Sequence, residues 1–279
     1  GESRRWLRSL NGGGTAAAFS VVGSIAEHAP GILQDSALDV VGAVCSALTS
    51  PPAPPAMGEA EHTSKASTCA PRDLLCAALN CLGQVLCPKD PAWRLPKDLE
   101  SCVPQALEHC AALLEPENAV AAHAGLSAKQ EASVRLSSAR CVLRVATRFD
   151  RLVPFDVQTK LSLVMQDPDR GVRRDFADDL GASVSRFQRQ RPPQSHLAAK
   201  HAAWLALAGA DPNRENRQLA TRQIVRYVVH AAENLRRLGE RDRRSGLVVM
   251  RPEFSLVYVI HALAHHSDYP TASEAEEFG

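Results

Sequence analysis

Apolar residues recur at helical spacing from one end of the chain to the other, and the strict apolar–polar alternation typical of strands is nearly absent. The breaks between apolar runs fall at prolines, glycines and Asp-Asn clusters. This pattern predicts an all-α protein. The expected helices cover residues 15–28, 32–49, 72–87, 99–114, 129–149, 155–166, 169–187, 195–209, 213–238 and 253–266.

Two corners between these helices carry nearly the same sequence. QDPDRGVR at 166–173 returns as ADPNRENR at 210–217, about 44 residues later, and HHSDYP at 265–270 is a weaker echo. An apolar helix precedes each corner. A period in the forties with two helices in each period is the signature of HEAT repeats. We therefore predict a HEAT-type α-solenoid of stacked antiparallel helix pairs, a fragment of a larger curved scaffold.

The first corner, inside MQDPDRGVRRDFADDL, can be interpreted as a reactive loop of carboxylates and arginines or as a bend between packed helices. Pro168 suits the first turn of a helix, and Asp167 can cap the free N–H groups behind it. Asp169 adds negative charge at the positive end of the helix dipole. Arg173 can reach an aspartate at its own corner or at a neighbouring one. These features favour the bend.

After this corner, one apolar stripe runs along the expected helix and should face the core of the solenoid. It consists of Val172, Phe176, Leu180, Val184 and Phe187. We assign a structural role to Asp167, Pro168, Val172 and Arg173 at the first corner and to Asp211, Pro212 and Arg217 at the second.

The overall composition narrows the class of protein. The chain has 279 residues and 45% hydrophobic content, which suffice for a large core. Its net charge of +1 argues neither for bulk affinity for nucleic acid nor for an acidic partner. Its eight cysteines form no CxxC pair, so we expect reduced, buried thiols in a cytosolic or nuclear protein. No apolar run is long enough to span a membrane, and the N-terminal stretch lacks a secretory core.

We expect five segments along the chain. Residues 50–71 are rich in Pro, Ala, Ser and charge and should form a disordered insertion. Helical repeats should occupy 1–49 and 72–153, HEAT-like repeats 154–270, and the start of a truncated helix 271–279. Because the sequence begins without Met and ends within a pattern, we expect it to be part of a longer protein.

Three stretches in the second half resemble a known family. In order and spacing, DPDRGVRRDFADDL, AWLALAGADPNRENRQLATRQIVRYV and PEFSLVYVIHALAHHSDYP resemble the late HEAT repeats of a cohesin-associated protein family. This sister-chromatid cohesion family is named for precocious dissociation of sisters, fifth member. The strong resemblance covers residues 154–270, and VIHALAHHSD at 259–268 is its most specific part.

The resemblance implies a non-enzymatic, hook-shaped scaffold in the nucleus. Members of the family bind the kleisin subunit of the cohesin ring and, with the release factor Wapl, regulate whether the ring stays on chromatin. It implies only indirect contact with chromatin, and no cofactor, metal, membrane or small-molecule substrate. The alternative is a HEAT scaffold of another type, such as a transport receptor or a phosphatase subunit.

The histidines near the end of the chain raise a different alternative. His261 and His265 lie four residues apart and share a helix face, a spacing that suits a metal-dependent enzyme. No third ligand is evident nearby, and no Glu stands between them as in a metalloprotease helix. Both also match positions of the family motif, where a helix end faces a turn. We therefore give them a structural role at the third corner.

Arginines gather along the expected helix 213–238. They can form a docking surface for an acidic peptide or for phosphates, where the guanidinium fork favours bidentate contacts, or simply a solvated face. The near-neutral chain disfavours direct binding of DNA. The candidate partner-binding residues are Arg214, Arg217, Arg222, Arg226 and Arg237.

Overall fold

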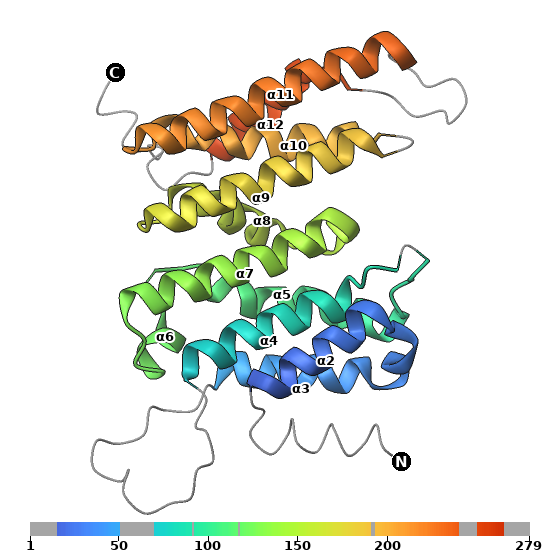
Figure 1. Ribbon diagram of the computed structural model, residues 1–279, viewed down its shortest axis with the longest axis vertical. Helices are drawn as coiled ribbons and strands as arrows, with labels where there is room; N and C mark the ends of the chain where they lie inside the picture. Colours follow the sequence, from blue (N-terminus) through green and yellow to red (C-terminus); the bar gives the residue numbers. More distant parts are fainter. Residues whose placement is uncertain are drawn as a thin grey trace, which may run out of the picture. The chain divides into compact units, whose positions relative to one another are not determined.

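The computed structural model describes residues 16–50, 70–90, 92–116, 118–190, 193–239 and 250–264. Within these ranges every regular element is a helix and there is no strand, which confirms the predicted all-α class (Figure 1). The α-helices are α2 (Ala16–His28), α3 (Ala37–Thr49), α4 (Pro71–Leu86), α5 (Lys97–Ala112), α6 (Ala119–His123), α7 (Ala128–Phe149), α8 (Phe155–Leu163), α9 (Arg170–Arg189), α10 (Ser195–Leu205), α11 (Arg214–Leu238) and α12 (Ser255–Ala264). Short 3₁₀ turns are η1 (Pro30–Ile32), η2 (Gln34–Ser36), η3 (Asp150–Leu152), η4 (Val164–Gln166), η5 (Ala206–Ala210) and η6 (Pro252–Phe254).

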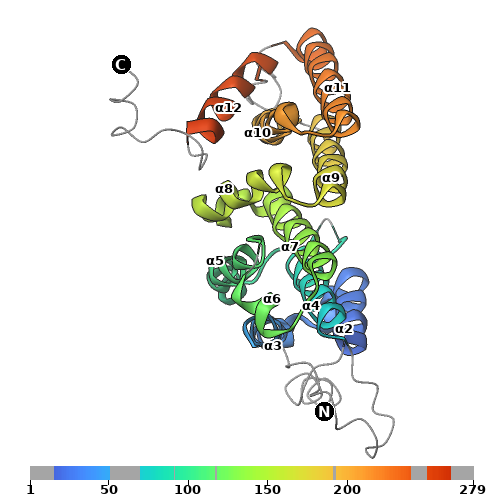
Figure 2. The same ribbon diagram turned by 90° about the vertical axis from the view of Figure 1, so that its left-hand side faces the viewer.

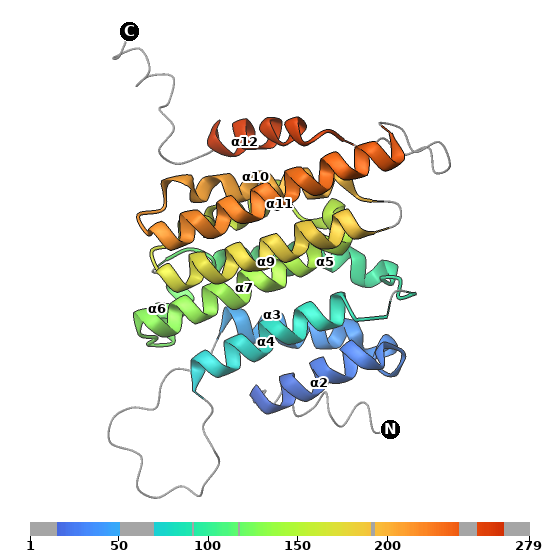
Figure 3. The same cartoon turned by 45° about the horizontal axis from the view of Figure 1, so that its top comes forward.

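The contacts divide the chain into two units, residues 1–161 and residues 162–279. In the first unit, α2, α4 and α7 lie side by side in one layer, and α3 and α5 form a second layer against α4 and α7 (Figure 2). In the second unit, α9 and α11 lie side by side, and α10 and α12 form the other layer (Figures 2 and 3). Each unit thus consists of stacked helix pairs, as HEAT-type repeats require.

The layers of the first unit are held together by α4, whose apolar residues follow the helical period. Leu75, Leu79, Leu82 and Leu86 are fully buried because spacings of three and four residues place them on one face. The backbones of α2 and α4 come close at Gly23, where an added Cβ would lie 3.1 Å from the Cα of Cys81. A larger residue at position 23 would push the two helices apart.

An arginine on α7 ties three segments of the first unit together. The Arg144 Nη2 atom donates to Glu27 Oε1 of α2 at 2.9 Å and to the Cys87 carbonyl after α4 at 2.8 Å. Burial acts to raise the pKa of Glu27, but the hydrogen bond and positive charge of Arg144 outweigh it and hold that pKa below its usual value. The carboxylate therefore stays charged and keeps its partner.

Sequence and structure differ most at the helix ends. The expected helix 32–49 begins only at Ala37, because residues 30–36 form the turns η1 and η2 around Leu33 instead. The short helix α6 was not predicted, although Asn118 provides an N-cap by accepting from Ala121 N at 2.8 Å.

Two predicted segments lie wholly or largely outside the described residues. They are the truncated helix at 271–279 and the insertion at 50–71, apart from Ser50, Ala70 and Pro71, the last of which begins α4. The boundary between the two units falls between Leu161 and Ser162, within α8. No helix in the part of the chain that the structure describes is long and apolar enough to cross a membrane.

The outer face of α12 is apolar and open to solvent. Leu256, Val257 and Ile260 are 60%, 62% and 65% exposed, and Leu263 is 47% exposed. Contiguous apolar surface of this kind favours association with another apolar surface. We therefore expect the chain to self-associate through α12.

Replacing Ile260 with lysine should reduce that association, because a charged side chain must be desolvated in an apolar interface. Static light scattering over a concentration series should give a lower apparent mass for Ile260→Lys than for the unchanged chain. Ile32→Lys is the matched control, since Ile32 is 66% exposed in the first unit. A monomer at every concentration before any substitution contradicts this expectation.

Candidate functional site

Both Asp-Pro corners of the second unit have the same local geometry, which differs from the predicted one in one respect. Asp169 is the N-cap of α9, since its carboxylate accepts from Gly171 N at 2.7 Å and Val172 N at 3.0 Å. Asp167 instead accepts from Asp169 N at 2.8 Å, and Pro168 precedes the helix. The predicted roles of Asp167 as cap and Pro168 as first-turn residue are therefore wrong. An Asx turn shifts the helix start by two residues.

The second corner repeats this arrangement. Asn213 caps α11 by accepting from Glu215 N and Asn216 N, and Asp211 accepts from Asn213 N at 2.7 Å. Pro212 is exposed, as Pro168 is at the first corner. The match in sequence between the two corners is thus a match in hydrogen bonding.

Arg173 joins the two corners through a buried ion pair. Its Nε and Nη2 atoms donate to the two oxygens of Asp211 at 2.7 and 3.1 Å, and its Nη1 atom donates to the Asp167 carbonyl at 2.6 Å. The side chains of Arg173 and Asp211 are 9% and 1% exposed. Of the two partners that the sequence left open for Arg173, the carboxylate belongs to the neighbouring corner.

The surroundings of Asp211 keep its carboxylate charged. Burial acts to raise its pKa, but hydrogen bonds from Arg173, the Asn213 backbone and Asn216 together hold that pKa below the usual value. Arg217, in the first turn of α11, donates to the Asp211 carbonyl. Four polar groups thus converge on one aspartate, and each belongs to the fold of the corner.

The histidine candidates are only partly covered by the structure. His261 is exposed on α12, and His265 lies outside the described residues. In the described ranges, no group of three or more His, Cys, Asp and Glu side chains is arranged to hold a metal ion.

His201, which the sequence did not single out, lies beside Ser183 in an arrangement that resembles a nucleophile and its base. Ser183 Oγ lies 2.8 Å from His201 Nδ1. His201 is fully buried, stacked on Trp204 and edge-on to Phe187, and burial together with the charge of Lys200 lowers its pKa to about 3. Since no substrate can reach a fully buried pair, its role is to pack α9 against α10.

The arginines of α11 serve different purposes. Arg217 is bound at the corner, and Arg214 and Arg222 are exposed on α11. Arg226 and Arg237 line one groove between α9 and α11, together with Arg189 and His230, which the sequence did not single out. The contribution of Arg189 could not be inferred from the sequence, because it lies on α9 and reaches the groove only through tertiary packing.

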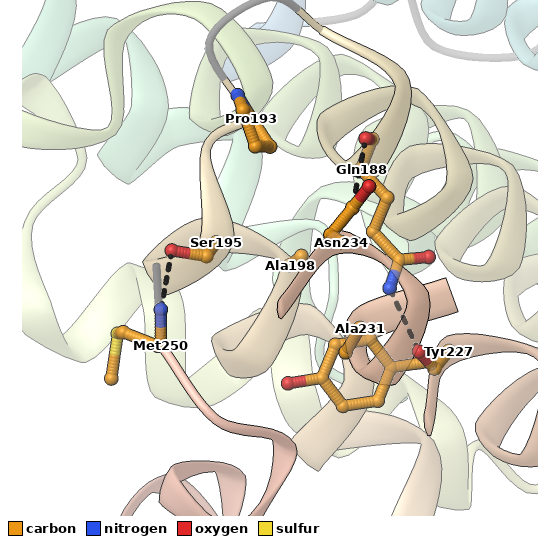
Figure 4. Close-up of a pocket in the computed structure, with 8 residues that line it drawn as sticks. All are labelled: Gln188, Pro193, Ser195, Ala198, Tyr227, Ala231, Asn234 and Met250. Atoms are coloured by element: carbon orange, nitrogen blue, oxygen red, sulfur yellow. Dashed lines mark hydrogen bonds between the residues drawn. The ribbon is translucent and has the colours of Figure 1, made fainter. Parts of the chain in front are cut away.

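A small pocket shares Gln188 and Asn234 with this groove, and hydrogen bonds around the pocket hold the end of α9 against α11. Gln188 Nε2 donates to the Tyr227 carbonyl at 2.8 Å, and Asn234 Nδ2 contacts the Gln188 carbonyl at 3.3 Å (Figure 4). On the opposite side of the pocket, Met250 N donates to Ser195 Oγ at 3.0 Å. The walls of the groove are therefore tied to each other through main-chain atoms.

The sequence matches the family described as "Sister chromatid cohesion protein PDS5 protein" over residues 7–278. The chain belongs to the PDS5 family. Among its relatives, PDS5 homolog B-A of Xenopus laevis is 24% identical over 168 residues, 60% of this chain and 11% of that protein. PDS5 homolog B of mouse and of human are each 25% identical over 146 residues, 52% of this chain and 9% of theirs. The chain thus spans about a tenth of the length of the curated relatives it matches.

Family membership confirms the resemblance drawn from the corner sequences. It favours a sister-chromatid cohesion protein over a transport receptor or a phosphatase subunit as the parent of these repeats. The PDS5-type repeats described above hold their shape through buried polar corners and leave part of the α11 surface open.

Replacing Asp211 with asparagine should destabilise the second unit, because Arg173 then remains buried without a counter-charge. We expect a loss of about 3 kcal/mol in the free energy of unfolding, measured by urea denaturation followed by circular dichroism. Glu215→Gln is the control, since its pair with Arg170 is exposed and should contribute less than about 1 kcal/mol. Equal effects of the two substitutions argue against this role of the buried pair.

The depressed pKa of His201 predicts a loss of stability in acid. The unfolded chain takes up a proton below about pH 6.5, while the folded chain resists it down to about pH 3. Stability should therefore fall as the pH drops between these values, by at most about 1.4 kcal/mol per pH unit from this residue. His201→Gln should flatten the dependence of the urea midpoint on pH between about pH 7 and about pH 5. His196→Gln, an exposed change on the same helix, should leave it unaltered.

Proposed function

We propose that this chain is part of a non-enzymatic HEAT-repeat scaffold that binds the kleisin subunit of cohesin. In the full-length protein, together with the release factor Wapl, this scaffold controls whether cohesin stays on chromatin in the nucleus. Contact with chromatin is indirect in this proposal, through the cohesin ring.

The observation that carries the proposal is the family match over residues 7–278. The relatives from frog, mouse and human are all named sister chromatid cohesion proteins. Because they are far longer than the matched stretch, the kleisin and Wapl contacts belong to the proposal and are not part of the match.

Two features of the second unit support a binding role. At the corners, Arg173, Asp211 and Asn216 are buried and hydrogen-bonded within the fold. The long helix α11 leaves Arg222 and Arg226 exposed on its surface. A stacked repeat with an open, arginine-bearing helix is suited to binding an extended or helical peptide.

A pull-down with the N-terminal region of the kleisin tests the proposal. The unchanged chain should retain the kleisin fragment, and the double variant Arg222→Glu, Arg226→Glu should retain less, because two attractive charges become repulsive. Arg174→Glu is a matched control, since Arg174 is exposed on α9 and does not line the groove.

The possible results have separate meanings. Unaltered retention by the double variant removes these two arginines from the contact. No retention by the unchanged chain, with circular dichroism showing intact helices, overturns the proposal for this region.

A further inference from the structure

The groove between α9 and α11 is a polar channel on the surface of the second unit. It has a volume of about 380 Å³ and is open to solvent on its outer side. Ser185, Gln188 and Arg189 line it from α9, and Arg226, His230, Glu233, Asn234 and Arg237 line it from α11. The two helices come close at Gly181, where an added Cβ would lie only 2.3 Å from the Gln223 side chain. The groove therefore has two walls set by close helix packing.

Positive charge dominates the groove. Three arginines line it against one carboxylate, that of Glu233. Among the residues that the structure describes, neither Arg189 nor Arg226 has a carboxylate within ion-pair distance. Arg189 donates to the Ser185 carbonyl at 3.1 Å, and Arg226 only approaches Gln223 Oε1 at 3.4 Å.

Arg173 and Arg144, whose role is structural, use their donors differently from the arginines of the groove. The guanidinium group of Arg173 binds two carboxylate oxygens and a carbonyl, and that of Arg144 binds a carboxylate and a carbonyl. In the groove, Arg237 approaches Glu233 only at 3.9 Å. The fold therefore leaves the donors of the groove arginines largely unused, and an arginine fork with free donors is suited to bidentate contact with a carboxylate.

The spacing of the arginines indicates the conformation of the ligand. Arg226 and Arg237 lie about 16 Å apart along α11, given about 1.5 Å of rise for each helical residue. An extended chain advances about 3.3 Å per residue and covers that distance in about five residues. An extended segment with two acidic residues separated by about four to six positions can thus place one carboxylate at each arginine, with Arg189 contacting it from the opposite wall.

We propose that this groove binds an extended, acidic peptide segment of a protein partner, anchored by carboxylates at Arg226 and Arg237. The partly exposed Ser185 and Asn234 provide hydroxyl and amide groups for its backbone. This inference deepens the proposed function. It rests on that function only in taking the chain to be a scaffold that binds peptides. It holds whichever protein supplies the segment.

Fluorescence anisotropy with a short labelled peptide tests the inference without any cohesin subunit. The probe carries two glutamates about five residues apart in a background of glycine, serine and threonine. The reference peptide has glutamine in place of each glutamate. We expect the glutamate peptide to bind at least about tenfold more tightly than the glutamine peptide, with affinity that falls as salt is added.

Charge reversal in the groove should abolish this preference. Arg226→Glu and Arg237→Glu should each weaken binding of the glutamate peptide by about tenfold or more, because attraction becomes repulsion. Both side chains are exposed, so the helical content measured by circular dichroism should not change. Arg174→Glu alters the net charge equally outside the groove and should leave binding within about twofold of the unchanged chain.

Three results overturn the inference. They are equal binding of the glutamine peptide, binding that survives both groove substitutions, and binding only when phosphoserine replaces glutamate. Each is distinct from failure of the proposed function. The peptide can bind when the kleisin does not, and the kleisin can be retained through other residues when the peptide does not bind.

Discussion

The second unit depends on one buried ion pair between successive repeats. Arg173 and Asp211 are separated by a whole helix pair in sequence, yet their charged groups meet at 2.7 Å with almost no exposure to water. Removing two charges from water carries a large desolvation cost, which only a full set of hydrogen bonds offsets. Carbonyls at the first corner, Asn216 and the backbone at the second corner supply those bonds. The pair ties the first turn of α9 to the corner that precedes α11, and these two helices form the walls of the groove.

The first unit uses arginine for the same purpose with different partners. Arg144 and Arg148 extend from α7 to carbonyls after α4, at Cys87, Pro88, Asp90 and Trp93, and Arg144 continues to Glu27. Most of these carbonyls lie in the connection that follows α4, outside any helix, so they need hydrogen-bond donors from elsewhere in the fold. In the first unit these arginines therefore satisfy main-chain groups of another segment, whereas in the second unit Arg173 binds a carbonyl of its own corner and the carboxylate of the next corner. These hydrogen bonds determine which parts of neighbouring helix pairs lie against each other, in addition to the packing of the apolar core.

The arginines of this PDS5-family chain therefore fall into two groups, those bound within the fold and those with donors open to a partner. Arginines whose donors meet carbonyls and carboxylates hold the repeats together, whereas those of the α9–α11 groove and of the exposed side of α11 have donors left for a partner. The buried Ser183–His201 pair belongs to the first class, although its geometry alone resembles catalytic chemistry. Burial, more than the type of residue, decides which polar groups can act on another molecule.

The sequence by itself determined the helical class, the repeat and the family, because these follow from local periodicity and from the corner residues around Asp167 and Asp211. It also predicted that Arg173 would reach an aspartate at one of the corners. Only the tertiary structure decided which aspartate that was, that Asp169 and not Asp167 caps α9, and that Arg189 joins Arg226 and Arg237. The reason is physical. Helix formation and apolar periodicity depend on neighbours within a few residues, whereas ion pairs and grooves depend on which helices pack together and in what register.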